Sequence, residues 1–459
     1  MQDDSFQNLQ SLTGMTDITD SITAPPILSP EEEGILHENT MMLLDDYMNE
    51  NILTMSHPKF HPNLFNELYQ FLLTQIEHIN SNDLEDILLD IVNCSITNYF
   101  MTFIPIRSFP NTFVRKHSIS IEKMRSKLDG LRNLPQPPQR TTEWYEFRYN
   151  LLTASTAWKG LDTKSCVNSL IYEKCQPLNT DKYNRVNTAS PFHHGTIFEP
   201  ISIAIYEKKY STIIEDFGCI PDQKYYYLGA SPDGINVDEK SPRFGRMLEV
   251  KNIVNREISG IPKKEYWVQM QMQMGVCQLN ECDFLETRFY QYETKDEFYS
   301  DGDFNTSEDG KMKGIFLYFI KDGKPYYEYP EIGLSKEEFT KWEDETMLKN
   351  SQLTWNKNIY WRLDVYSCVL VLRNKKWFKL AAEKLGEVWK IIEKERVEGY
   401  KHRAPKSNKK VYSSPVLKPF SGCLINIKDL DNITLTENAN KCNITETDKN
   451  GNPLIRINI

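Results

Sequence analysis

The sequence has little that would build a metal cluster or a disulfide framework. Its nine cysteines are scattered over 459 residues without a CxxC pair, and its eight histidines form no HExxH pattern. An odd number of dispersed cysteines is typical of reduced thiols in an intracellular protein. The composition therefore excludes a disulfide-rich secreted scaffold and predicts no zinc site.

Long apolar runs are also missing. No stretch approaches the roughly 18 uninterrupted apolar residues that a membrane-spanning helix needs, and the N-terminus has no basic, apolar signal peptide. We therefore expect a soluble intracellular protein without a membrane partner.

Positive charge is absent from the first 50 residues, which hold eleven Asp and Glu and no Lys or Arg. The net charge of −10 comes mostly from this segment, so it does not exclude a nucleic-acid partner for the rest of the chain. Residues 240–265 hold seven Lys and Arg against three Asp and Glu, which favours a polyanionic substrate. For any single cation there, a solvated loop is an equally good interpretation.

Composition and apolar periodicity divide the chain into five segments: residues 1–40, 41–135, 136–345, 346–405 and 406–459. We expect the first segment to be acidic and mostly disordered, and the second to be helical. The third mixes helical and strand patterns, which predicts an α/β fold with a central mixed sheet flanked by helices. The fourth predicts a helical extension, and the fifth is a polar tail.

Two charged residues alternate with apolar ones in "RMLEVKNI". A strand period of two puts Glu249 and Lys251 on one face and Leu248 and Val250 on the other. Leu248 and Val250 are therefore predicted to lie in the core. Burying an unpaired charge costs several kcal/mol, so the opposite face must either pair its charges or hold something against them.

A further carboxylate precedes this strand in "LGASPDG", with fifteen residues between Asp233 and Glu249. The Pro-Asp-Gly turn can swing Asp233 toward Glu249, and two such carboxylates repel each other unless a cation lies between them. A hard divalent ion, Mg²⁺ first, resolves that repulsion. The spacing matches the PD-(D/E)XK nuclease signature, although an ordinary surface hairpin also carries such residues.

The surrounding segments supply further polar residues that could belong to the same site. "HGTIFEP" supplies Glu199 on a predicted helix over 193–210. A second predicted helix, "KKEYWVQMQMQMGVCQL", carries Tyr266, Gln269 and Gln273 at positions i, i+3 and i+7 of one face. A solvated face would explain this stripe, but its place between two strands makes full exposure a poor fit.

The order "EWYEFRYNLLTAS … HGTIFEP … LGASPDG … LEVK … YWVQMQMQM" resembles the YqaJ-type viral recombinase family, which includes the exonuclease of phage lambda. Herpesvirus alkaline nucleases and CRISPR-adaptation nucleases are more distant relatives. The resemblance covers roughly residues 141–292 and implies a restriction-endonuclease-like core. The N-terminal helical and C-terminal extensions resemble nucleases of giant DNA viruses, which implies the host cytoplasm or the viral factory as the location.

Carried over motif by motif, the resemblance implies Mg²⁺, with Mn²⁺ as a substitute, held by Asp233, Glu249 and the Val250 carbonyl. It implies catalytic roles for Lys251, Glu199 and Gln269. Gln269 with Tyr266 would line the scissile phosphate, and Tyr266 and Gln273 would bind the substrate. The cysteines that bind an iron–sulfur cluster in the CRISPR relatives have no counterpart, so no cluster is expected.

The first motif also carries Arg148 and Ser155. The resemblance implies that both hold the 5′-phosphate of a DNA end, which predicts a 5′-to-3′ exonuclease on linear duplex ends. The residues alone leave open that Ser155 only caps a helix and that Arg148 pairs with Glu146 or Asp162.

The implied partners are DNA and a helicase or single-strand annealing protein, in recombination, repair or degradation of foreign DNA. The alternatives are an inactive DNA-end-binding or scaffold protein and a nuclease with endonuclease or RNase activity. Monomer, dimer and ring trimer all stay open.

Overall fold

The computed structural model describes residues 28–76, 82–115, 120–139, 141–179, 187–188 and 190–405, together with 446–447 and 453–454. They belong to two units, Met1–Pro405 and Lys406–Ile459. In the second unit β11 (Glu446–Thr447) pairs with β12 (Pro453–Leu454), and the rest of the predicted polar tail lies outside the described residues. No described helix is long and apolar enough to cross a membrane.

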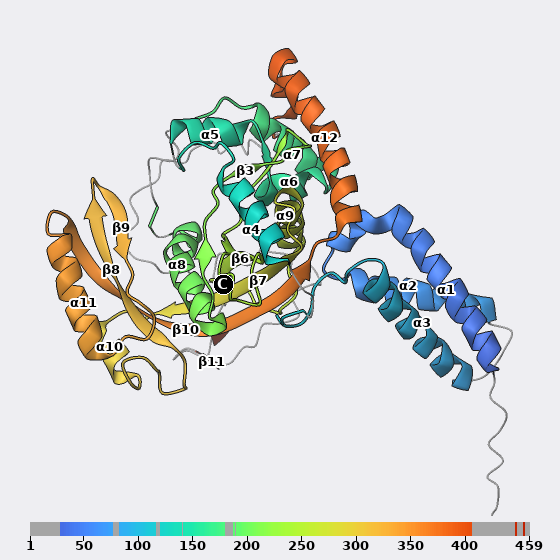
Figure 1. Cartoon of the computed structure of the whole chain (residues 1–459), viewed down its shortest axis with the longest axis horizontal. Coiled ribbons are helices and arrows are strands. Elements are labelled where there is room, and N and C mark those ends of the chain that lie inside the picture. The colour runs from blue at the N-terminus through green and yellow to red at the C-terminus, as the bar shows by residue number, and fades with distance from the viewer. Residues whose placement is uncertain are drawn as a thin grey trace, which may run out of the picture. The chain divides into compact units, whose positions relative to one another are not determined.

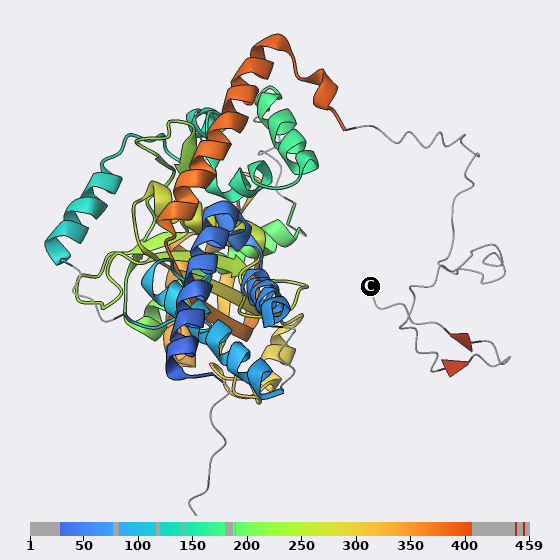
Figure 2. The same cartoon turned by 90° about the vertical axis from the view of Figure 1, so that its right-hand side faces the viewer.

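The first unit begins with helices (Figures 1 and 2): α1 (Pro30–Asn51), η1 (Ile52–Ser56), α2 (Phe60–Ile76), α3 (Asn82–Thr102) and α4 (Ile121–Arg132). The backbone N–H of Glu32 donates to the Ser29 hydroxyl, and the Glu32 carboxylate accepts from the Ser29 N–H, so a capping box starts α1. The prediction of disorder over 1–40 is therefore wrong for residues 30–40, while residues 1–27 lie outside the described residues.

The remaining elements of the first unit are α5 (Thr142–Tyr149), β1 (Leu152–Thr153), α6 (Ala154–Gly160), α7 (Lys164–Cys175), α8 (Pro191–Tyr210), β2 (Ile214–Glu215), β3 (Ile220–Pro221), β4 (Leu228–Ala230), β5 (Gly234–Asn236), β6 (Met247–Asn252), α9 (Lys264–Val276), β7 (Glu281–Gln291), α10 (Lys295–Ser300), β8 (Lys313–Lys321), β9 (Lys324–Glu328), α11 (Lys336–Lys349), β10 (Thr354–Leu372), α12 (Lys375–Glu398) and η3 (Lys401–Arg403).

Seven strands form the central sheet in the order β2-β5-β6-β7-β10-β8-β9. The pair β6–β7 is parallel and is connected through α9, whereas the other neighbours are antiparallel. A smaller sheet has the order β1-β4-β3. The predicted α/β fold, a central mixed sheet flanked by helices, is confirmed.

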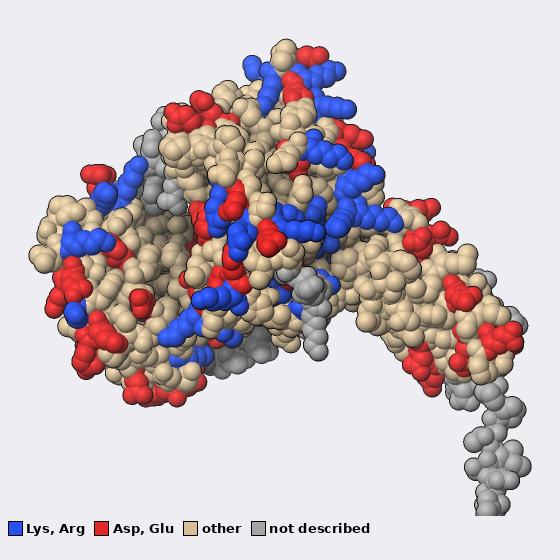
Figure 3. Space-filling model, in the orientation of Figure 1, with Lys and Arg blue, Asp and Glu red and all other residues tan. Residues whose placement is uncertain are grey.

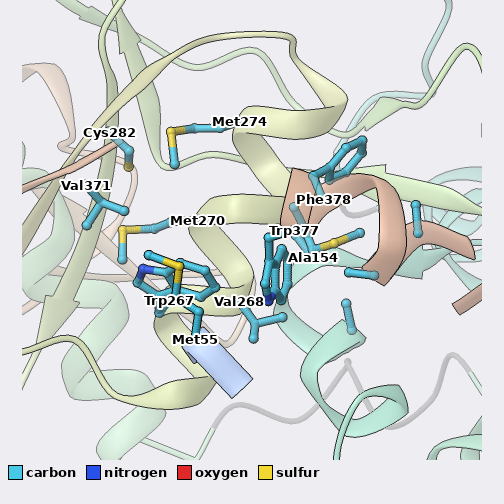
Figure 4. Packing of buried hydrophobic residues seen from close by; sticks show 14 of the residues in the cluster. Met55, Ala154, Trp267, Val268, Met270, Met274, Cys282, Val371, Trp377 and Phe378 are labelled. Carbon is cyan, nitrogen blue, oxygen red and sulfur yellow. The ribbon is translucent and has the colours of Figure 1, made fainter. Parts of the chain in front are cut away.

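Two helices cover opposite faces of β6. Tyr206 of α8 clusters with Leu248 and Val250, which are 0% and 5% exposed, so the predicted core face is confirmed. Trp267 and Met270 of α9 pack in the cluster on the other side, where Figure 4 shows them beside Trp377 of α12. The rings of Trp267 and Trp377 meet edge to face at 5.0 Å, which fixes α9 and α12 against each other.

The prediction of a helical extension over 346–405 is wrong in its first half. Residues Thr354–Leu372 form β10, which lies between β7 and β8 in the sheet. Its sequence is rich in aromatic and β-branched residues, which fit a strand packed on both sides. The helical spacing begins only after it, in α12, where Trp377, Ala381, Val388 and Ile392 are buried.

Candidate active site

The candidate site lies at the first residue of β5, where the pairing of β5 with β6 ends. Gly234 and Leu248 are partners in the antiparallel pair, so extending that register by one residue sets Asp233 opposite Glu249. Instead of continuing the strand, Asp233 accepts a hydrogen bond on Oδ2 from the backbone N–H of Val250, at 2.7 Å. The Pro-Asp-Gly turn therefore brings two carboxylates to one edge of β6, as the spacing predicted.

Glu249 is the buried centre of the site. Its carboxylate is fully buried, forms an ion pair with Lys251 and accepts a hydrogen bond from Gln273 Nε2 at 2.7 Å. Burial lowers the pKa of Lys251, but the charges of Glu249 and Asp233 outweigh it and raise that pKa above 10.5. Lys251 therefore stays protonated at neutral and mildly alkaline pH, and its side chain, 23% exposed, reaches the surface of the site.

Asp233 lies in a repulsive environment. Burial, and then the negative charge of Glu249, raise the pKa of Asp233 well above its ordinary value of 3.8, with a smaller contribution from Glu199. Lys251 acts in the opposite direction. Three carboxylates thus act on one another beside a single partly buried lysine, and the site favours an additional cation.

Asn252 holds α8 against β6. Its Nδ2 donates to the carbonyl of Gly195 at 2.8 Å, and its Oδ1 accepts from the hydroxyls of Ser202, at 2.7 Å, and Thr287, at 2.6 Å. Gly195 and Ser202 lie about one turn before and after Glu199 on α8. These contacts fix the α8 segment that carries Glu199, whose charge acts on Asp233.

The polar stripe of α9 faces the acidic edge of β6. Gln269 and Gln273 are 9% and 0% exposed, so the interpretation as a solvated face is wrong. Besides Glu249, Gln273 Nε2 contacts the carbonyl of Ser231 at 3.1 Å. Lys251 Nζ lies 5.4 Å from the centre of the Tyr266 ring, which packs beneath the ammonium group.

Arg148 reaches the loop that carries Asp233. Its Nη1 donates to the Ser231 hydroxyl at 2.9 Å, and its guanidinium group lies 4.6 Å from the centre of the Trp144 ring. Of the two carboxylates left open as partners of Arg148, Asp162 pairs with Lys264 instead. Arg148 is therefore near the acids, although it comes from α5.

Arg148 and Thr153 line a cavity of about 430 Å³ together with Lys174. Lys174 donates to the carbonyls of Arg148 and Leu151, and burial, then the charges of Arg396 and Arg148, lower its pKa to about 7. α6 begins at Ala154 with Thr153 as its N-cap, so Ser155 is the second residue of the helix and does not cap it. Ser155 is exposed, with its Oγ 3.3 Å from Thr153 Oγ1.

Residues 143–280 match the sequence model of the YqaJ-like viral recombinase domain. Residues 143–280 are thus similar to a YqaJ-like viral recombinase domain, and this likeness covers less than half of the chain. The resemblance that five motifs indicated is thereby confirmed, and the domain holds all ten predicted site residues.

The uncharacterized protein R354 of Acanthamoeba polyphaga mimivirus is 25% identical over 310 residues, which are 59% of this chain and 55% of that protein. The match therefore spans about half the length of that giant-virus relative. Two crystal structures of the alkaline exonuclease LHK-Exo, from Laribacter hongkongensis and in complex with dAMP, align over 56% of this chain and 94% of theirs. Their identities are 17% and 18%, with a TM-score of 0.33.

The donors in the YqaJ-like domain suit a hard divalent cation. Within the described part of the chain no three Asp, Glu, His or Cys side chains form a metal-binding group. The candidate donors are instead two carboxylates, from Asp233 and Glu249, and the Val250 carbonyl, and Mg²⁺ prefers such oxygens together with water. Gln273 Oε1 is buried without a hydrogen-bond partner beside them. This unsatisfied acceptor and the mutual repulsion of the acids both fit a cation with bound water.

The positive charge predicted from residues 240–265 is partly internal. Arg243 and Arg246 are buried in the YqaJ-like domain and pair with Asp283, and Arg246 also pairs with Glu281. These two arginines therefore stabilise the core and do not form a substrate surface. The count of Lys and Arg in residues 240–265 therefore overestimates the positive charge at the surface.

Sequence reasoning missed three residues of this site: Ser231, Asn252 and Lys174. Ser231 lies within the motif LGASPDG and Asn252 directly follows LEVK, but their partners come from helices far away in the sequence. Lys174 lies on α7, outside every motif, and only its position in the cavity identifies it.

Proposed function

We propose that the protein is a divalent-metal-dependent DNA nuclease that acts as a 5′-to-3′ exonuclease on linear duplex ends. The observation that carries this proposal is the buried pairing of Glu249 with Lys251 directly opposite Asp233, inside a YqaJ-like domain. Two carboxylates with a lysine beside them suit metal-assisted phosphodiester hydrolysis, in which a bound ion activates water and stabilises charge on the phosphate.

Asp233, Glu249 and the Val250 carbonyl would hold Mg²⁺, for which Mn²⁺ would substitute. When bound, the ion lowers the pKa of water and offsets negative charge on the phosphate. Glu199, close enough to raise the pKa of Asp233, would orient water at the acidic edge.

The remaining side chains act on the substrate and on one another. Lys251 stays charged and exposes part of its side chain, so it would stabilise the charge that develops on the scissile phosphate. Gln269 and Tyr266 would line that phosphate. Gln273 is fully buried against Glu249, which supports a role in positioning this carboxylate more than in direct contact with DNA.

Arg148 supports the preference for ends. Its guanidinium group borders a cavity of about 430 Å³ and contacts Ser231, two residues before Asp233, so a bound 5′-phosphate would lie near the acids. Because the pKa of Lys174 is about 7, that lysine is largely neutral under alkaline conditions, and Arg148 would supply the positive charge. Ser155 would add a hydroxyl donor for the phosphate beside Thr153, which lines the cavity.

The test uses four substrates, each with and without Mg²⁺: a linear duplex with 5′-phosphates, a linear duplex with 5′-hydroxyls, a covalently closed duplex circle, and duplex RNA. We expect Mg²⁺-dependent release of nucleotides from the 5′-phosphorylated strand, with the circle intact. Cleavage of the circle would indicate an endonuclease, and cleavage of RNA an RNase. Binding of ends without hydrolysis would identify a DNA-end-binding protein.

A further inference from the structure

A second large cavity lies away from the acidic edge of β6. It has a volume of about 1100 Å³ and extends between the end of α3, with the segment that follows it, and the start of α12. Its lining includes three exposed apolar side chains and three cationic ones: Met101, Phe103, Phe113, Arg115, Arg373 and Lys375. Most of its lining lies outside residues 143–280, which match the YqaJ-like domain.

One side of this groove is apolar and exposed. Met101, Phe103 and Phe113 are 80%, 64% and 41% exposed, although each has a large apolar side chain. Phe113 is held by an edge-to-face contact with Phe109 at 5.0 Å between ring centres. Exposed apolar residues gathered in one groove indicate a binding surface, because scattered ones would not share a cavity.

The other side is cationic. Arg373 and Lys375 line this side, and their charges, after burial, lower the pKa of Lys127, which lies close to them on α4. Figure 3 shows Lys and Arg side chains gathered over α4 and the first half of α12, the elements that carry Lys127 and Lys375. Among the described residues, the one acidic side chain that lines the groove is Glu281, which pairs with Arg115 and Arg246. The groove therefore presents net positive charge to a ligand.

We propose that this aromatic–basic groove binds single-stranded DNA. Unpaired bases stack on exposed aromatic rings, while the phosphates between them interact with cations, and the groove offers both. A duplex stacks its bases internally and cannot place them on Phe103 or Phe113. The inference goes beyond the proposed nuclease and does not depend on it, because no residue of the acidic edge takes part.

Binding of a fluorescent oligothymidylate to the full-length protein in EDTA tests this inference without any cleavage. Phe103→Ala should weaken binding at least about fivefold through the loss of one stacking platform. Lys375→Ala should weaken binding and make the salt dependence shallower by about 0.7 in the slope of log K against log salt. Both side chains are exposed, so the variants should keep the wild-type melting temperature.

Leu348→Ala and Lys390→Ala are matched controls, since Leu348 is 77% exposed on α11 and Lys390 is exposed on α12, both outside the groove. They should bind as the wild type does. Unchanged binding by Phe103→Ala and Lys375→Ala would overturn the inference. A loss in Lys375→Ala alone would also overturn it, because that result indicates a general polyanion surface without base stacking. An inactive nuclease that still binds oligothymidylate through Phe103 would leave the inference intact.

Discussion

The environment of Asp233 in the metal-free protein disfavours its ionised carboxylate. Burial and the charge of Glu249 raise its pKa, so its ionised form destabilises the folded state at neutral pH. Asp233→Asn removes that charge and keeps an oxygen for the Val250 N–H. We expect the melting temperature of the metal-free variant to rise by about 1–4 °C at pH 8. The gain should shrink as the pH falls through the raised pKa of Asp233 and vanish below 3.8, where the carboxyl is protonated in both the folded and the unfolded protein.

With excess Mg²⁺, the wild type should instead have a higher melting temperature than Asp233→Asn. A ligand that binds only the folded state stabilises it, so the wild type should gain more melting temperature from Mg²⁺ than Asp233→Asn. Asp129→Asn, which alters an exposed ion pair with Arg132, serves as the matched control. An equal shift in wild type and Asp233→Asn would show that Asp233 does not hold the ion.

Arg148 gives the second prediction at this scale. A charge-assisted hydrogen bond to a phosphate is worth about 1.5–3 kcal/mol, so Arg148→Ala should reduce the preference for 5′-phosphate over 5′-hydroxyl duplexes by at least about tenfold. The measurement is the ratio of cleavage rates on the two substrates. Arg125→Ala, which breaks an exposed ion pair with Glu239, should leave the ratio unchanged. Equal rates on both substrates for the wild type would reject the phosphate pocket and leave the nuclease proposal standing.

At the scale of elements, Asn252 connects α8 to the sheet. Asn252→Ala removes hydrogen bonds to Gly195, Ser202 and Thr287, which should destabilise the fold by about 1–3 kcal/mol. It should also slow cleavage, because the α8 segment around Glu199 is no longer fixed.

Asn350 is a matched control. Its buried side chain also bridges two groups, the Glu328 carboxylate and the Thr346 carbonyl, but it lies at the end of α11, away from the candidate site. Asn350→Ala should lower stability by a similar amount and leave the rate constant for cleavage unchanged. Chemical denaturation and single-turnover kinetics on the same preparations separate the two effects. An equal loss of rate in both variants would contradict a positioning role for Asn252.

The sequence predicted those elements whose periodicity is strong. Alternation in β6 identified Leu248 and Val250 as core, and the spacing on α9 identified a face directed at Glu249. β10 was missed because its aromatic and β-branched residues precede a long amphipathic helix, and the helical pattern was extended backward over them. What makes that segment a strand is its pairing with β7 and β8, which lie far away in the sequence.

Site residues were predictable where the chemistry is local. Asp233, Glu249 and Lys251 lie in short motifs, and a register argument brings them together. Gln273 was predicted to bind the substrate, and its hydrogen bond to Glu249 was not predicted because this contact depends on how α9 packs over β6. No spacing rule reveals such a contact before the helix is placed.

At the scale of the whole molecule, the sheet extends beyond the predicted boundary at residue 345. β10 contacts both β7 and β8 and so connects the two halves of the sheet. A chain that ends at residue 345 should therefore show no cooperative thermal transition. A chain that ends at Pro405, the last residue of the first unit, should keep the melting temperature and the cleavage rate of the full-length protein. Cooperative unfolding of the shorter chain would contradict the assigned position of β10.

The central claim is that Asp233 and Glu249 form the reactive centre of a metal-dependent nuclease. The most direct test compares wild type and Asp233→Asn in the release of nucleotides from a 5′-phosphorylated linear duplex, with Mg²⁺ and with EDTA. We predict release by the wild type only with Mg²⁺, and a rate at least about 100-fold lower for the variant, which remains folded. Near wild-type release by Asp233→Asn, or wild-type release in EDTA, would contradict the claim.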